Sequence, residues 1–327
     1  MKKTLIALAV LAASTASMAQ VTLYGVADVA VGAADKASPG LGFANDKFQA
    51  VASNVMNNTT SRFGLKGVED LGSGMTAGFN FEGGMSLADG SGNLSGGQMF
   101  SRAANVYLQG GFGRLTAGRQ LTTSFFSVYS WELTGTSNYS VVGNQFGFGG
   151  HGPRDSGAIK YDLAANGFNA SAMFVLEGNN VYTAGTPATG KGKYDLSVGY
   201  AAGPMVASLA YNKVDSGVEG TVLGGSYDFG MVKVAASYTS LKSGTGDKLT
   251  EGYSLGASIP MGAFTFTADM AQDTISRAAS STDTNFLLEA KYALSKRTFV
   301  YGAYVMDGKG KTKEDASAYS LGLRHNF

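Results

Sequence analysis

The sequence predicts an all-β protein, a sixteen-stranded antiparallel transmembrane β-barrel with a long third loop folded into its lumen. Three observations favour this fold. Apolar and polar residues alternate with a period of two along most of the chain, and the connections between alternating segments are short and long by turns. One stretch of about thirty residues breaks the alternation. The alternation predicts strands with one apolar and one polar face, and the unequal connections predict a barrel with two unlike ends.

The first nineteen residues have the pattern of a secretory signal. Lys2 and Lys3 precede an apolar run over residues 5–13, and Ser17, Met18 and Ala19 form a small-x-small cleavage site. We therefore expect residues 1–19 to be a signal peptide and residues 20–327 to form one barrel domain. The alternative is a membrane anchor, but the run is too short to span a bilayer.

Composition narrows the function classes. The chain has 327 residues with 25 basic and 24 acidic side chains, and no block of like charge points to nucleic acid. It has no Cys, which excludes disulfides, thiolate nucleophiles and Cys-based metal sites. We expect no nucleic-acid partner and no cofactor. No segment keeps a period of 3.6 residues, so we also expect almost no helix.

Alternating segments recur from the mature start to the C-terminus. The clearest cover residues 21–29, 62–67, 75–82, 159–163, 194–200, 232–238, 264–270 and 286–292. We expect one face of these strands, with Val232, Val234, Phe264 and Phe266, to meet lipid. The other face should meet water and carries Lys233, Thr265 and Asp269 among other charged or polar residues.

The connections set the strand number. Seven are short and rich in turn residues, at 70–74, 110–113, 166–167, 202–204, 228–230, 260–262 and 295–296. Eight are longer, near 36–61, 87–98, 122–153, 177–191, 214–219, 242–249, 274–283 and 308–315. Fifteen connections join sixteen strands, with the short turns at one end as in outer-membrane barrels.

A soluble barrel or sandwich is the competing architecture. It would bury its apolar face, and its loops would not separate by length in this way. The many charged residues on the polar face favour the membrane barrel instead. Sixteen strands enclose more space than side chains fill, so the lumen should be an aqueous channel.

The third long loop, residues 121–153, is rich in Phe and Tyr and holds the one Trp of the chain. A segment of this composition is not a solvated linker and needs a surface to fold against. The interior of the barrel is the space large enough, which predicts that this loop folds into the lumen. The alternative is an external loop packed on the barrel rim.

Four separated motifs resemble the trimeric general porins of the Gram-negative outer membrane. They cover residues 21–25, 61–72, 112–120 and 322–327. The resemblance implies a homotrimer in the outer membrane, surrounded by lipid and lipopolysaccharide, that lets small polar solutes and ions diffuse passively. It also implies that the third loop narrows the pore. By the same resemblance the terminal Phe327 is an assembly signal read by the barrel-insertion machinery.

The family pattern places a basic cluster on the pore wall. Arg62, Arg102 and Arg154 stand at the matching positions, with Lys66 one lumen-facing step beyond Arg62. Glu132 is the one carboxylate of the third loop and should lie opposite. Because the cations outnumber it, we expect a constriction that weakly to moderately prefers anions.

Two other functions stay open from the residues. A substrate-specific channel could use Tyr129, Trp131 and Tyr139 of the third loop to stack on sugars or aromatic acids. A barrel hydrolase would need a Ser or Asp partner for His151 or His325, and the spacing offers neither. We therefore expect a channel and not an enzyme.

Overall fold

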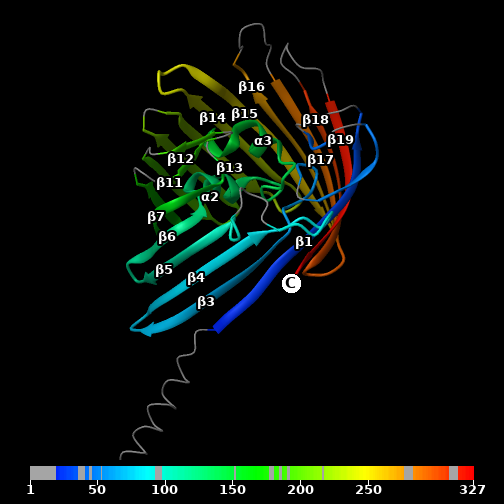
Figure 1. The fold of residues 1–327 in the computed structure, drawn as a ribbon. Coiled ribbons are helices and arrows are strands. Elements are labelled where there is room, and N and C mark those ends of the chain that lie inside the picture. Colours follow the sequence, from blue (N-terminus) through cyan, green and yellow to red (C-terminus); the bar gives the residue numbers. More distant parts are fainter. Residues whose placement is uncertain are drawn as a thin grey trace, which may run out of the picture.

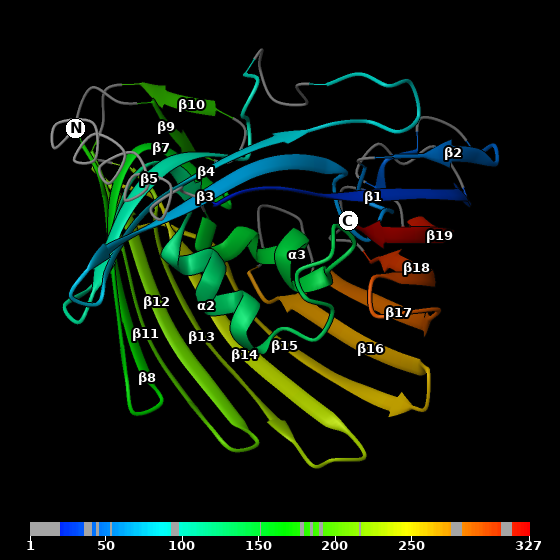
Figure 2. The ribbon, with the colours of Figure 1, turned by 90° about the horizontal axis from the view of Figure 1, so that it is seen from below.

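The computed structural model describes residues 20–35, 41–43, 46–52, 54–92, 98–150, 152–176, 180–183, 186–189, 192–215, 217–275, 283–308 and 316–327. The expected signal peptide over residues 1–19 lies outside the described residues, and so does His151. The described part of the chain is mostly strand, wound into one ring with two helices on its inner side (Figures 1 and 2).

The ring is a closed antiparallel β-barrel. The sheet has 17 strands, of which the short β2 (Gln49–Val51) is an addition to the edge of β1, so sixteen strands make the wall. They are β1 (Gln20–Ala34), β3 (Arg62–Gly72), β4 (Met75–Gly84), β5 (Ala103–Gly110), β6 (Gly113–Leu121), β7 (Arg154–Ala165), β8 (Phe168–Val175), β11 (Lys193–Ala202), β12 (Met205–Val214), β13 (Glu219–Asp228), β14 (Lys233–Lys242), β15 (Lys248–Met261), β16 (Phe264–Asp273), β17 (Asp283–Ala293), β18 (Thr298–Asp307) and β19 (Ala316–Asn326). A separate hairpin is formed by β9 (Asn180–Thr183) and β10 (Thr186–Thr189).

The first strand closes the barrel. Residues 20–26 of β1 pair with β3, and residues 26–34 pair with β19. Consecutive strands pair around the rest of the ring, which leaves the wall without an open edge. Closure of this kind is what a strand-built membrane protein requires, because lipid offers no hydrogen-bond partner to an unpaired edge.

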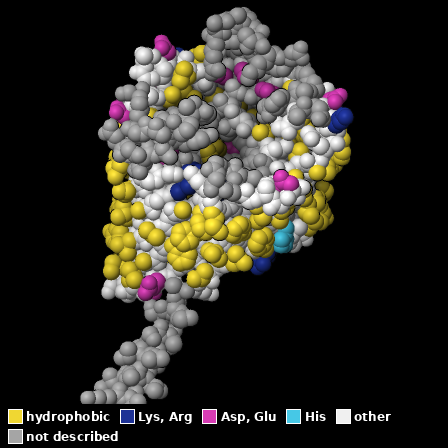
Figure 3. Space-filling view, in the orientation of Figure 1, with side chains coloured by type: hydrophobic (Ala, Val, Ile, Leu, Met, Phe, Trp, Pro, Cys, Tyr) yellow, Lys and Arg dark blue, Asp and Glu magenta, His cyan; other side chains and the backbone are white. Residues whose placement is uncertain are grey.

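The wall turns its apolar side outward. On β11, Lys193, Asp195 and Ser197 are buried toward the inside, while the alternate residues Leu196 and Val198 are exposed on the outside. The expected outward positions Phe264 and Phe266 are exposed, as predicted. Asp269 of the same strand faces the other way. Figure 3 shows hydrophobic side chains gathered across the visible outer face of the wall.

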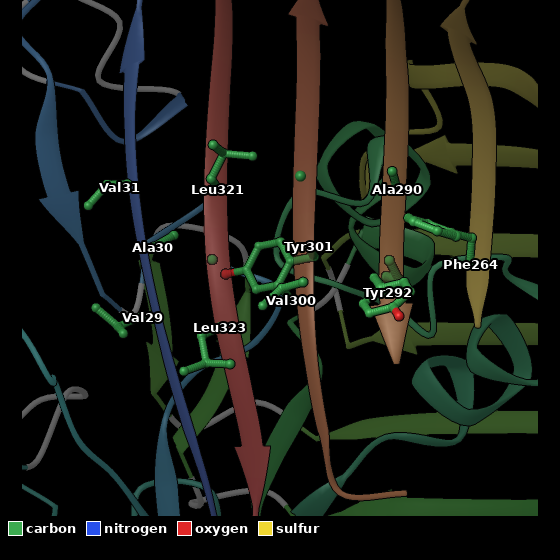
Figure 4. A pocket seen from close by; sticks show the side chains of 13 residues that line it. Val29, Ala30, Val31, Phe264, Ala290, Tyr292, Val300, Tyr301, Leu321 and Leu323 are labelled. Carbon is green, nitrogen blue, oxygen red and sulfur yellow. The ribbon is translucent and has the colours of Figure 1, made fainter. Parts of the chain in front are cut away.

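A shallow apolar groove of about 520 Å³ lies where the last strands meet the first. Val29 and Val31 of β1, Leu321 and Leu323 of β19, and Val300 of β18 contribute to it (Figure 4). Gly302 of β18 keeps the wall low beside Leu321. The groove is part of the outer surface and not of the lumen.

The predicted connections are confirmed where the structure describes them. All seven short turns fall between the expected strands, and the eight longer connections join the opposite ends. At the turn with Asn166 and Gly167, both residues have the positive φ angles, 53° and 83°, that a type I′ turn requires. The period-two pattern and the turn residues therefore identify all sixteen wall strands.

The expectation of almost no helix is wrong for the third long loop. Two helices interrupt it, α2 (Thr123–Trp131) and α3 (Val141–Gly150). Thr122 caps α2, because its hydroxyl accepts a hydrogen bond from the backbone N–H of Phe125 at 3.1 Å. Within the described residues no helix is long and apolar enough to cross a membrane.

Candidate functional site

Helix α2 is fastened to the inner face of the wall. The carboxylate of Asp195 on β11 accepts hydrogen bonds from the hydroxyls of Thr123 and Ser124, at 2.7 Å and 2.6 Å. The buried ring of Trp131 donates to Ser208 Oγ on β12 at 3.1 Å. It covers Gly224 of β13, where an added Cβ would lie 2.2 Å from the ring. Small residues on the wall thus make room for the helix, which Figure 2 shows within the ring of strands.

Tyr139, between the two helices, ties the segment to the opposite part of the wall. Its hydroxyl donates to Glu289 on β17 and accepts a hydrogen bond from Asn58 Nδ2 at 2.8 Å. The side chain is fully buried. Burial raises the pKa of the Tyr139 hydroxyl well above its usual range, and the adjacent Glu289 carboxylate raises it further. The hydroxyl therefore stays protonated, and able to donate, at neutral pH.

A cavity of about 900 Å³ lies between these helices and the strands on the other side. Three of the predicted basic residues line it together: Arg62 at the start of β3, Arg102 just before β5, and Arg154 at the start of β7. Arg154 Nε donates to the backbone carbonyl of Arg102 at 3.0 Å. The structure thus brings together side chains from three parts of the chain that are distant in sequence.

One carboxylate sits within this basic cluster. Glu82 of β4 forms an ion pair with Arg102, whose Nε lies 2.6 Å from Glu82 Oε1. The other carboxylate oxygen, Oε2, lies 3.5 Å from Arg62 Nε. All three side chains are mostly buried. A carboxylate shared by two guanidinium groups fixes their positions and neutralises one charge of the pair. No sequence motif marks Glu82 as part of the site, although its strand register predicts that it lies on the polar face.

Two further cations line the cavity that the family pattern did not single out. Arg324 of β19 donates to Asn58 Oδ1 at 2.6 Å, and Lys291 of β17 lies 3.0 Å from Glu289 Oε2. Lys291 lies between Ala290 and Tyr292 and Arg324 between Leu323 and His325, so both occupy the inward positions of their strands. The period-two pattern of their strands could therefore have indicated that Lys291 and Arg324 face the lumen, although the family pattern did not single them out.

Lys66 and Glu132 are not brought to this cavity. Lys66 is exposed on the polar face of β3, with its ammonium 5.3 Å from the centre of the Tyr24 ring, and is not among the lining residues. Glu132 is only 5% exposed. Its carboxylate accepts hydrogen bonds from the backbone N–H groups of Thr134 and Thr136 and from the hydroxyls of Thr134 and Ser140. These hydrogen bonds fasten the Glu132 carboxylate within its own loop, and its expected place opposite the arginines stays a prediction.

Aromatic rings also line the cavity. They belong to Phe125, Phe126 and Tyr129 of α2, Phe148 of α3 and Phe299 of β18. Of the three aromatic residues proposed for a binding track, Tyr129 is exposed, but Trp131 and Tyr139 are 1% and 0% exposed and pack against the wall. Among the described residues, no group of three or more His, Asp or Glu is placed to hold a metal ion.

Comparison with known proteins decides the family. The profile described as "Gram-negative porin" matches residues 4–313 of the chain. The chain belongs to the Gram-negative porin family. It is 34% identical to outer membrane porin protein 32 of Delftia acidovorans and 28% identical to an outer membrane porin protein of Bordetella pertussis, in both cases over 100% of each chain. These relatives and the barrel place this porin in the outer membrane.

A solved structure agrees with the fold. An anion-selective porin from Comamonas acidovorans superimposes with a TM-score of 0.75 and 26% sequence identity, over 94% of this chain and 100% of that one. The recognition of a sixteen-stranded outer-membrane porin from the sequence is confirmed. Family and fold are those of channels that carry out no chemical reaction.

Proposed function

We propose that this porin is a water-filled channel for passive diffusion of small hydrophilic solutes and ions, with a weak to moderate preference for anions. The observation that carries the proposal is the charge balance of the cavity. Its lining includes five cations, Arg62, Arg102, Arg154, Lys291 and Arg324, and one carboxylate, Glu82. Fixed positive charge in a narrow aqueous passage raises the local concentration of anions and lowers that of cations.

The segment over residues 122–153 is proposed as the constriction. Support comes from its hydrogen bonds to the polar faces of β11, β12 and β17 and from the cavity that it shares with the basic cluster. Solutes would be sorted there by size and charge. The anion selectivity stated for the porin from Comamonas acidovorans supports the same preference in this relative.

The test is the reversal potential of single channels in a KCl gradient across a planar bilayer. The parent should show an anion-preferring potential. The triple variant Arg62→Ala, Arg102→Ala and Arg154→Ala should shift the potential toward cations. Lys66→Ala removes one positive charge from the same face outside the cavity, so its shift should be much smaller. A triple variant with the parent's potential would contradict the proposal.

We also infer a homotrimer, as the resemblance implies. The apolar groove beside β1, β18 and β19 supports it, because it offers a low, glycine-containing surface against which a second barrel could pack. Light scattering of the detergent-solubilised porin should give three times the mass of the mature chain. The mass of one chain at working concentration would reject the trimer. Contact with lipopolysaccharide is expected at the exposed aromatic and polar residues above the apolar band.

A further inference from the structure

Two exposed aromatic rings, those of Phe126 and Tyr129, lie on the inner side of the barrel, where contact with lipid cannot account for them. Phe126 and Tyr129 are 44% and 53% exposed, yet they line the cavity that the arginines line. The opposite side of α2 is the one that packs on the wall, through Val128 and Trp131. Lipid covers apolar side chains on the outer surface, but it does not reach this cavity.

The rings form a continuous surface, here called the aromatic face, made of Phe125, Phe126, Tyr129 and Phe148. Phe125 stacks on Tyr129 with ring centres 6.1 Å apart and planes at 13°. It meets Phe126 edge-on at 5.8 Å and Phe148 at 5.0 Å. A surface in which one ring contacts three others is ordered by its own contacts and offers a flat partner for a further ring.

The backbone at Phe148 shows that this surface is held at a cost. Phe148 has φ 55° and lies between Gly147 and Gly149, which also have positive φ. The left-handed region is disfavoured for a bulky residue. Here that conformation places the ring of Phe148 against Phe125 at the edge of the cavity.

The charges that line the same cavity as the aromatic face determine the sign of charge that a ligand should carry. Arg62, Arg102 and Arg154 offer guanidinium donors, and the one carboxylate among them, Glu82, is engaged by two of these groups. A sugar bound on aromatic rings also needs acceptors for its hydroxyl groups, and this wall offers mainly donors. An anion with an aromatic ring matches both sides.

We propose that the cavity is a saturable binding site for arene carboxylates, with the ligand ring on the aromatic face and its carboxylate on the arginine cluster. This rests on the proposed function, since it names a solute class for the same passage. Arginine suits a carboxylate because the planar guanidinium donates two parallel hydrogen bonds. At about 900 Å³ the cavity is within the range of small-molecule sites, so a one-ring acid fits while water fills the remainder.

The experiment compares benzoate with acetate as blockers of the chloride current through single channels in a planar bilayer. The two anions carry the same charge and differ by the ring. Half-block by benzoate should need a concentration about tenfold lower than by acetate, because one aromatic contact of this kind is worth about tenfold in affinity. Benzyl alcohol has the ring without the charge and should block far less than benzoate.

The variant Phe126→Leu with Tyr129→Leu keeps apolar volume and removes two rings. It should retain the parent's reversal potential in KCl and lose most of the difference between benzoate and acetate. Phe266→Leu, on the lipid side of β16, is the matched control and should keep that difference.

The two proposals fail separately in this design. If the parent shows no anion preference in the KCl gradient, the proposed function is wrong. If the preference is present but benzoate blocks no better than acetate, the arene-carboxylate site alone is overturned. The parent comparison stands even if the double variant does not fold, and a double variant that conducts normally but still distinguishes benzoate would also overturn the site.

Discussion

Ser171 and Ala172 are neighbours on β8, but Ser171 faces the water-filled lumen and Ala172 faces the lipid. Ser171 donates to Asp162 Oδ1 at 2.7 Å on the inner face, and Ala172 lies between the outward residues Tyr161 and Leu196. Ala172→Arg should destabilise the barrel by about 2–4 kcal/mol if the position lies near the bilayer midplane, because a guanidinium on the lipid face is poorly solvated. Ser171→Arg, at nearly the same depth beside a carboxylate, should cost much less. Urea unfolding from lipid vesicles measures both, and equal losses would contradict the assigned register.

At the C-terminus, Phe327 packs against Gly25 of the first strand. The backbones of these residues exchange two hydrogen bonds of 3.0 Å, and the Phe327 ring lies over Gly25 so closely that an added Cβ would be 2.3 Å from Cζ. Gly25→Ala should therefore displace the ring and weaken the closure of β19 on β1. Its effect should appear as a lower midpoint of unfolding in urea.

The role of Phe327 as an assembly signal is still a proposal, and substitution separates it from this packing role. Phe327→Ala keeps the backbone pair, so slower appearance in the outer membrane together with a normal final pore would support recognition of the ring. Gly25→Ala disturbs the packing without removing the terminal aromatic, and it should not delay delivery to the same extent. Unchanged outer-membrane levels of Phe327→Ala would count against the signal.

Residue by residue, the sequence predicted the site unevenly. The three arginines were singled out because they stand at positions that match the family pattern, and all three line one cavity. Glu132 was expected in the pore because it is the one carboxylate of the third loop, but hydroxyl and backbone N–H donors of that loop bind its carboxylate. Sequence spacing does not reveal which of several donors in a Ser- and Thr-rich loop will meet a carboxylate.

At the scale of elements, α2 and α3 were missed for a physical reason. Helix α2 has apolar side chains on two sides, Val128 and Trp131 on the wall and Phe126 and Tyr129 in the cavity, so no single apolar stripe marks it. Its stability comes from the Thr122 cap and from the anchoring at Asp195, which is 72 residues from Thr123. Contacts so distant in the chain leave no local pattern.

Tyr139 gives an element-scale prediction about the attachment of this segment. Tyr139→Phe removes the donor to buried Glu289, and a buried acceptor left without its partner costs about 1–3 kcal/mol. The segment over residues 122–153 should then fluctuate more, seen as greater current noise in the open channel. Tyr304→Phe, whose hydroxyl lies on the exposed outer surface, is the control and should leave the noise unchanged.

The same contact predicts a dependence on pH. The folded-state pKa of Tyr139 is raised, so its contribution to stability is complete below the ordinary tyrosine value of about 10 and is lost as pH rises beyond it. Current noise due to ionisation of the Tyr139 hydroxyl should stay constant from neutral pH to pH 9 and should increase only in strong alkali. Noise that already rises between pH 6 and 8 would show that another group controls the segment.

For the whole molecule, the fold was the most predictable level. Alternation such as that of β11 repeats around the ring, and each repetition is an independent observation of the same architecture. The strand number could be predicted from the turns, because six of the seven short turns contain a Gly with positive φ. The cavity was less predictable, since its shape depends on where a long segment settles within the ring.

Channel selectivity is a property of the whole pore, and two carboxylates test its source. Glu82→Gln and Glu132→Gln remove the same charge, but Glu82 lines the cavity beside two arginines while Glu132 is enclosed in its loop. We expect Glu82→Gln to increase the anion preference in a KCl gradient and Glu132→Gln to change it little.

The increase should fade with salt, because the Debye length falls from about 10 Å at 0.1 M to about 3 Å at 1 M. It should not vary between pH 5 and 8, since guanidinium groups stay charged throughout that range. The measurement is the reversal potential of each variant, Glu82→Gln and Glu132→Gln, at low and at high KCl. A shift for Glu132→Gln as large as that for Glu82→Gln would mean that the loop carboxylate, and not the arginine cluster with its partner, sets the field through which ions pass.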